Sequence, residues 1–225
     1  MNILDLELIT NHSLQDLANF YTKLLAKSPL EYIDQYLRLQ VGTTQLSFKH
    51  QKSDRPARYH FAIHIPENQF TNAHAWMGQQ VKLIINNEGK DMFYSESWDA
   101  DSLYFYDPAG NILELIAHHR LDNKSNKIFN AHSLLSVCEI GIAADNVAQQ
   151  VDALKTQIDV NPYRTSVDPE FTPVGDAQGL FIVVKQGRTW FPNTGIPAEH
   201  LPVNVTVEQN GLTKRLTFPS GNVLI

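Results

Sequence analysis

Residues 104–119 read YFYDPAGNILELIAHH, which is typical of two apolar strands joined by a tight turn. The turn residues Asp107, Pro108 and Gly110 occupy positions at which a type I turn prefers these residue types. Folding alone therefore accounts for the turn. The second strand is less simple, because it carries the carboxylate of Glu114 among apolar residues.

Alternation along this second strand places four side chains on one of its faces, namely Ile112, Glu114, Ile116 and His118. A buried carboxylate is costly unless it is paired, hydrogen-bonded or bound to a metal. Two interpretations stay open. Glu114 accepts hydrogen bonds from an Arg, a Tyr or the backbone, or it serves metal binding or catalysis.

The rest of the chain contains one pattern three times: an apolar strand, a short polar turn and an amphipathic helix. The first helix is the clearest, because Ser13 is a good N-cap and residues 14–25 carry an apolar stripe at helical spacing. Further strands follow each helix. The pattern predicts an α+β protein of three units, which we term the first unit (about 1–55), the second unit (56–121) and the third unit (130–192).

The segments between and after the units suggest the domain organisation. The polar stretch within 122–129 predicts a linker, which separates a domain at 1–121 from a region at 130–225. The latter contains the third unit and a C-terminal hairpin about Asn210 and Gly211, a favoured tight-turn pair.

Composition limits the classes of function. The 225 residues are 43% hydrophobic and 19% charged, as in a soluble globular protein. A formal net charge of −6 without a Lys/Arg run gives no footprint for nucleic acid or an anionic membrane. The single cysteine, Cys138, fits a reducing cytosol, and no export signal or membrane span is apparent. We expect a cytoplasmic protein.

Two stretches carry a resemblance to a known family: LQDLANFYTKLL (14–25) and YFYDPAGNILELI (104–116). They are similar to the first helix and the last strand pair of the vicinal oxygen chelate superfamily, which includes glyoxalases, bleomycin-resistance proteins and extradiol dioxygenases. The resemblance implies βαβββ units that pair into curled mixed sheets around a cleft, often with a divalent metal. It implies that the first and second units form one such cleft.

The resemblance also selects candidate metal ligands on the first and last strands of a unit. In the second unit these positions hold His60 and Glu114, whereas in the first unit they fall near Leu6 and Ser47. The four-ligand pattern of glyoxalase I is therefore not met.

In the third unit the equivalent positions fall at about Cys138 and Ile182, so no second site is expected there. His64 cannot join His60 on one ion, because four residues of strand separate them by roughly 13 Å. A third ligand could come from Glu7, His50 or a partner chain. The expected ion is iron, manganese, nickel or zinc.

Three functional hypotheses stay open. One is a metal-dependent lyase, isomerase or dioxygenase acting on a small molecule with adjacent oxygens, in which Glu114 is a ligand or a general base. Another is a metal-free, drug-type binding protein, whose cleft is lined by aromatic residues: Phe93, Tyr94, Trp98, Tyr104 and Tyr106. The last is a structural or regulatory relic. A homodimer is expected, because an unpaired third unit would expose one face of its sheet.

Overall fold

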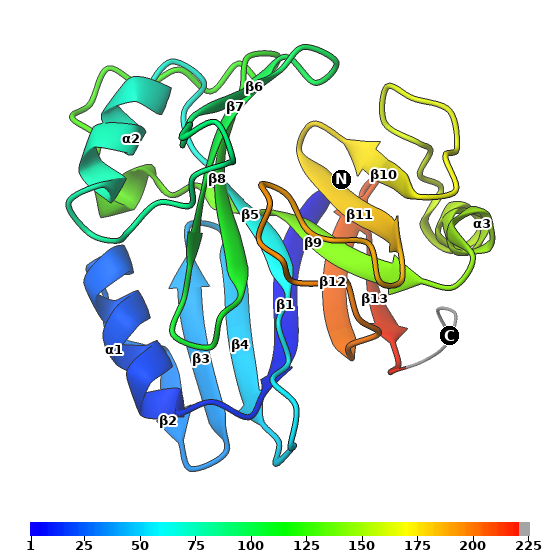
Figure 1. Ribbon diagram of the computed structural model, residues 1–225, viewed down its shortest axis with the longest axis horizontal. Helices are drawn as coiled ribbons and strands as arrows, with labels where there is room; N and C mark the ends of the chain where they lie inside the picture. The colour runs from blue at the N-terminus through cyan, green and yellow to red at the C-terminus, as the bar shows by residue number, and fades with distance from the viewer. Residues whose placement is uncertain (221–225) are drawn as a thin grey trace.

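A computed structural model describes residues 1–220 of the chain, and they form two mixed β-sheets with three α-helices (Figure 1). The first sheet has the strand order β13-β12-β1-β4-β3-β2. Its strands are β1 (Asn2–Thr10), β2 (Glu31–Ile33), β3 (Tyr36–Val41), β4 (Thr44–His50), β12 (Val203–Gln209) and β13 (Leu212–Phe218).

The second sheet has the order β10-β11-β9-β5-β8-β7-β6. Its strands are β5 (His60–His64), β6 (Phe93–Ser95), β7 (Ala100–Tyr106), β8 (Ile112–His118), β9 (Ser136–Ala144), β10 (Phe171–Asp176) and β11 (Gly179–Lys185). The helices are α1 (Leu14–Leu25), α2 (Phe70–Met77) and α3 (Val147–Ile158), with a 3-10 turn at Ala131–Ser133.

Helix α1 confirms the prediction for residues 14–25. The Ser13 hydroxyl accepts a hydrogen bond from the Asp16 amide, and the helix ends at Ala26, which has a left-handed φ of 50°. Its apolar stripe is buried against β3, and Leu17 and Tyr21 are fully inaccessible to solvent. Burial of this stripe, rather than helix propensity alone, stabilises the helix.

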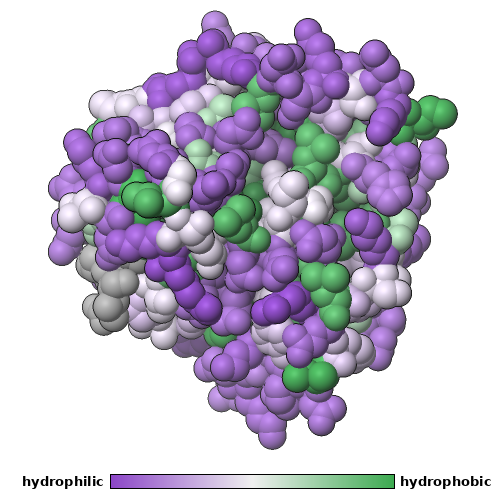
Figure 2. Space-filling model, turned by 180° about the vertical axis from the view of Figure 1, so that it is seen from behind, coloured by the Kyte–Doolittle hydropathy of each residue, from purple (hydrophilic) through white to green (hydrophobic). Residues whose placement is uncertain are grey.

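The two sheets share one apolar core. Phe48 of the first sheet and Phe61 and Leu113 of the second belong to the same cluster of buried side chains. Because strand residues alternate, His60 and Glu114 point to the opposite face of the second sheet. The surface seen in Figure 2 is mostly hydrophilic, with hydrophobic residues in small groups.

The units pair differently from the arrangement expected from sequence. β5 of the second unit pairs with β9 of the third unit, and β1 of the first unit pairs with β12 of the C-terminal hairpin. The expectation that the first and second units enclose the cleft was therefore wrong. The hairpin itself is confirmed, with positive φ at Asn210 and Gly211, and it completes the sheet of the first unit. The domain division at 122–129 stays a prediction.

No helix within residues 1–220 is long and apolar enough to cross a membrane.

Candidate metal centre and its pocket

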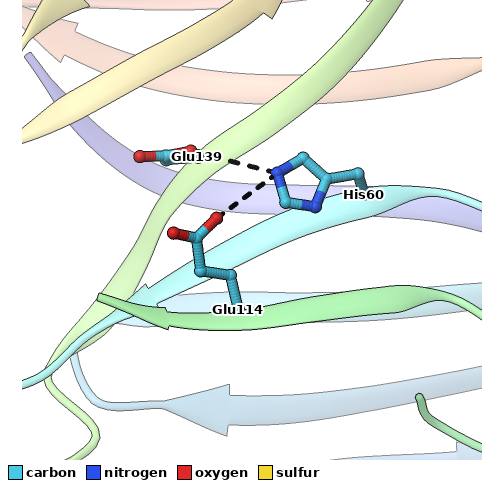
Figure 3. A group of neighbouring side chains, drawn as sticks. All are labelled: His60, Glu114 and Glu139. Carbon is cyan, nitrogen blue, oxygen red and sulfur yellow. Dashed lines mark ion pairs between the residues drawn. The ribbon is translucent and has the colours of Figure 1, made fainter. Parts of the chain in front are cut away.

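Three buried side chains from adjacent strands converge on one point of the second sheet. The Nε2 atom of His60 on β5 lies 3.6 Å from Oε2 of Glu114 on β8 and 4.0 Å from Oε2 of Glu139 on β9. Figure 3 shows the imidazole facing both carboxyl groups. One potential ligand atom from each residue lies within 4.8 Å of the other two, which is the spacing of groups able to hold one metal ion.

The strand register explains this convergence. Ala62 lies opposite Glu114 on one side and opposite Glu139 on the other. His60 precedes Ala62 by two residues, so both point to the same face. Because the side chain of Ala62 is a single methyl group, both carboxyl groups have room to approach the imidazole.

A β-bulge brings Glu139 to this face. Ala62 pairs with Glu139, but the next residue, Ile63, pairs with Val137, so that Cys138 is an extra residue in β9. Val137 and Ile140 both pack in the shared core, while Cys138 packs with Ala62 on the opposite face. The extra residue therefore lets Cys138 and Glu139 both point away from the core.

The expectation that Cys138 occupies the ligand position of the third unit was wrong for this reason. In a regular strand, one of the neighbours Cys138 and Glu139 would point into the core. Because of the bulge, both point away from it. A signal for Glu139 was present in the sequence: it is a carboxylate in the apolar run VCEIGI, as Glu114 is in ILELI. Ile182 does line the site, and its side chain offers no donor atom.

The sequence candidates for a third ligand lie elsewhere. Glu7, on β1 of the first sheet, accepts a hydrogen bond from Asn204 at 2.9 Å. His50 ends β4 of the same sheet. His64 lies beside His118, with ring centroids 5.5 Å apart, and neither joins the group around His60.

Hydrogen bonds fix the orientation of His60 and Glu114. The Nδ1 atom of His60 lies 3.2 Å from the carbonyl oxygen of Ile112 and must donate to it, which leaves the Nε2 lone pair facing the carboxyl groups. The Ser102 hydroxyl donates a hydrogen bond to the Tyr104 hydroxyl at 3.2 Å, and hydrogen bonding from both hydroxyls favours the ionised form of Glu114. Such contacts hold metal-ligating side chains in position in other proteins.

Burial dominates the electrostatics of the group. It lowers the pKa of His60 to about 4 and raises the pKa of Glu114 to about 8. Burial also raises the pKa of Glu139 well above its usual range, and the charge of Glu114 adds to this effect. Without a cation, each of the three groups thus favours its neutral form.

One atom of the group has no partner. Within residues 1–220, Oε1 of Glu139 is buried without a hydrogen bond, which is rare for a carboxyl oxygen. A divalent cation would remove this deficit and would also favour the ionised form of both carboxyl groups. The residues present therefore fit a metal ion.

The three residues form the floor of a pocket of about 310 Å³. Four of the five aromatic residues expected at the cleft line it, and Tyr106 does not. No sequence pattern indicated Trp190 and Phe191, which follow β11 and also line the pocket. The other lining residues are Ser95, Ser97, Ala100, Ser102, Ile116, Phe171, Ile182 and Arg188.

Comparison with known proteins identifies the fold. No protein-family model and no curated protein matches the chain. Among solved structures, a point mutant of glyoxalase I from Zea mays matches with a TM-score of 0.57 and 12% identity, over 99% of this chain and 90% of that chain. A candidate dioxygenase from Bacillus subtilis matches with a TM-score of 0.57 and 13% identity, over 82% of this chain and 63% of that chain. The chain therefore has the fold of the vicinal oxygen chelate superfamily, which glyoxalases and related dioxygenases share.

Proposed function

We propose that the protein is a divalent-metal-dependent enzyme of the glyoxalase or dioxygenase type, acting on a small molecule with adjacent oxygen atoms. The observation that carries this proposal is the convergence of His60, Glu114 and Glu139 at the floor of a pocket. The fold supports it, because it is the fold of glyoxalase I from Zea mays. A glyoxalase or dioxygenase activity of this chain is part of the proposal.

The ligand set determines which ions would suit the site. One imidazole and two carboxylates match manganese, iron, nickel and zinc better than they match copper(I). Three protein ligands are also the number that catalytic zinc sites use, with other positions open to water or substrate. When bound, the ion would act as a Lewis acid on the substrate oxygens.

The chain's own residues would contribute three effects. The bond from His60 to Ile112 keeps Nε2 free to ligate. Tyr104 and Ser102 orient the Glu114 carboxyl group. In a proton-transfer version of the reaction, Glu114 would serve as the general base instead of as a ligand, because burial raises the pKa of its unligated carboxyl group to about 8.

A metal-free binding protein is the second candidate. The aromatic lining of the pocket favours it, because pockets for small molecules are mostly apolar with few polar groups. It requires no metal at His60, and metal analysis therefore separates the two candidates.

The test is elemental analysis of protein purified without chelator, for the wild type and the variants Glu114→Gln and Glu139→Gln. Glu7→Gln is the matched control, because it removes one carboxylate outside the site. The proposal expects close to one equivalent of a divalent metal in the wild type and control, with a loss of at least tenfold in each site variant. Wild-type protein that stays metal-free after incubation with manganese, iron, nickel and zinc would overturn it.

We propose two further properties. We propose the cytoplasm as the location, because a single cysteine fits a reducing compartment. We also retain a homodimer, although the third unit already pairs with the second unit within one chain. Sedimentation analysis tests the dimer.

A further inference from the structure

Arg188 is the one Lys or Arg among the pocket-lining side chains of the described residues. It follows β11 and is partly exposed, whereas Glu114 and Glu139 are 3% and 1% exposed. The charged groups of the pocket are thus separated, with the guanidinium near solvent and the carboxyl groups at the floor.

The Arg188 guanidinium is held by an aromatic ring rather than by an acid. Its central carbon lies 5.0 Å from the centroid of Phe171. In the part of the chain that the structure describes, no carboxylate pairs with it. This contact with the ring leaves the N–H donors of the guanidinium free for a ligand.

Rings line the space between Arg188 and the floor. Tyr104 and Phe93 lie with their ring centroids 5.6 Å apart, and Phe191 lies 5.4 Å from Tyr104. Trp190 lies 5.0 Å from the His60 ring and so reaches the floor. A ligand that reaches from Arg188 to the floor of the pocket contacts aromatic rings along most of its length. This lining favours a ligand with a flat apolar body.

We propose that the pocket binds an organic carboxylate with a planar aromatic body, its carboxylate paired with Arg188 and its opposite end directed at His60, Glu114 and Glu139. A carboxylate matches the geometry, because a guanidinium binds it through two parallel hydrogen bonds. The charge also matches, since one arginine without further cations balances one negative charge. The placement of the ligand's opposite end at His60, Glu114 and Glu139 rests on the proposed function. The contact between the ligand's carboxylate and Arg188 does not, because it needs no metal.

Isothermal titration calorimetry of chelator-treated protein tests the contact, with 2-naphthoate as the probe and the neutral 2-naphthamide as its matched comparison. The variants are Arg188→Gln and Arg188→Lys. The control is Arg55→Gln, which makes the same charge change at an exposed position between β4 and β5. Circular dichroism of each variant verifies its folding.

We expect the wild type and Arg55→Gln to bind 2-naphthoate at least tenfold more tightly than 2-naphthamide. Arg188→Gln should lose this preference and bind the amide within twofold of the wild type. Arg188→Lys should retain part of the preference. Equal binding of acid and amide by the wild type, an equal loss in Arg55→Gln, or no binding of 2-naphthoate would overturn the proposal.

The two proposals fail in different ways. A protein that holds metal but shows no preference for 2-naphthoate rejects the carboxylate subsite alone. A protein that prefers 2-naphthoate through Arg188 but holds no metal rejects the metalloenzyme and retains the binding pocket.

Discussion

Gly141 on β9 lies directly against the indole ring of Trp190. A Cβ atom at position 141 would lie 2.4 Å from Cη2 of that ring, closer than real Cβ atoms approach a neighbour. The ring in turn lies 5.0 Å from the ring of His60. The absence of a side chain at Gly141 thus permits the observed position of Trp190 beside His60.

Gly141→Ala should therefore displace Trp190 and lower stability by about 1–3 kcal/mol, the usual cost of overpacking a core. Thermal unfolding measures the change in stability, and 2-naphthoate binding measures the change in the pocket. Gly78→Ala is the control, because a Cβ atom there would meet its nearest neighbour at 3.5 Å. Unchanged stability in Gly141→Ala would mean that Trp190 moves freely.

Metal binding should stabilise the fold. An ion that binds only the folded state adds about 2.7 kcal/mol at a free concentration of 100 Kd. We expect manganese, nickel or zinc to raise the melting temperature of the wild type and of Glu7→Gln, and to leave that of Glu139→Gln unchanged. Equal shifts in the wild type and Glu139→Gln would place the ion elsewhere.

The buried histidines His64 and His118 should make the protein acid-sensitive. Burial lowers their pKa values to about 3 and about 4, and for His64 the nearby His118 adds to the effect. In the folded state both stay neutral, while in the unfolded chain they bind protons below a pKa of about 6.5. The contribution of the two neutral histidines to the free energy of unfolding is therefore complete above pH 6.5 and is lost as the pH falls toward 4.

Urea unfolding at pH 7 and pH 5 measures this loss. Each histidine contributes roughly 1.4 kcal/mol per pH unit within the window. The double variant His64→Gln/His118→Gln should lose less stability than the wild type between the two pH values, with metal removed from both. The same loss in both proteins would assign the acid sensitivity to other groups.

Asn111 should be essential to the turn formed by residues 107–110. Its side chain accepts a hydrogen bond from the Tyr59 amide at 2.8 Å and donates one to Asp107 at 2.8 Å, and both Asn111 and Asp107 are buried. Asn111→Ala leaves the buried Tyr59 amide without a partner, at about 1–3 kcal/mol, whereas Asp107 keeps the hydrogen bond that it accepts from the Tyr21 hydroxyl at 2.9 Å. Asn2→Ala, which removes an exposed hydrogen bond to Glu208, should change stability by about 0.5 kcal/mol or less. Urea unfolding of both variants compares them.

The sequence was sufficient for features that depend on local pattern. Spacing predicted helix α1, and alternation placed Glu114 opposite the core-facing Leu113 and Leu115. The pairing of β5 with β9 was not predictable in this way, because strands of similar apolar pattern compete for the same neighbours. Glu139 was missed because one unpaired residue in β9 changes the faces of all residues after it.

The strand pairs β1/β12 and β5/β9 differ in the burial of their polar faces. Between β1 and β12, Glu7 lies opposite Asn204 and both are partly exposed, whereas between β5 and β9, Glu139 lies opposite Ala62 and both are buried. The core face is apolar in each pair, with Leu6 opposite Val205 in one and Phe61 opposite Ile140 in the other. The same kind of strand pairing thus places a partly hydrated carboxyl group in one sheet and a dehydrated one in the other, and only the dehydrated carboxyl group gains the reactivity that loss of water confers.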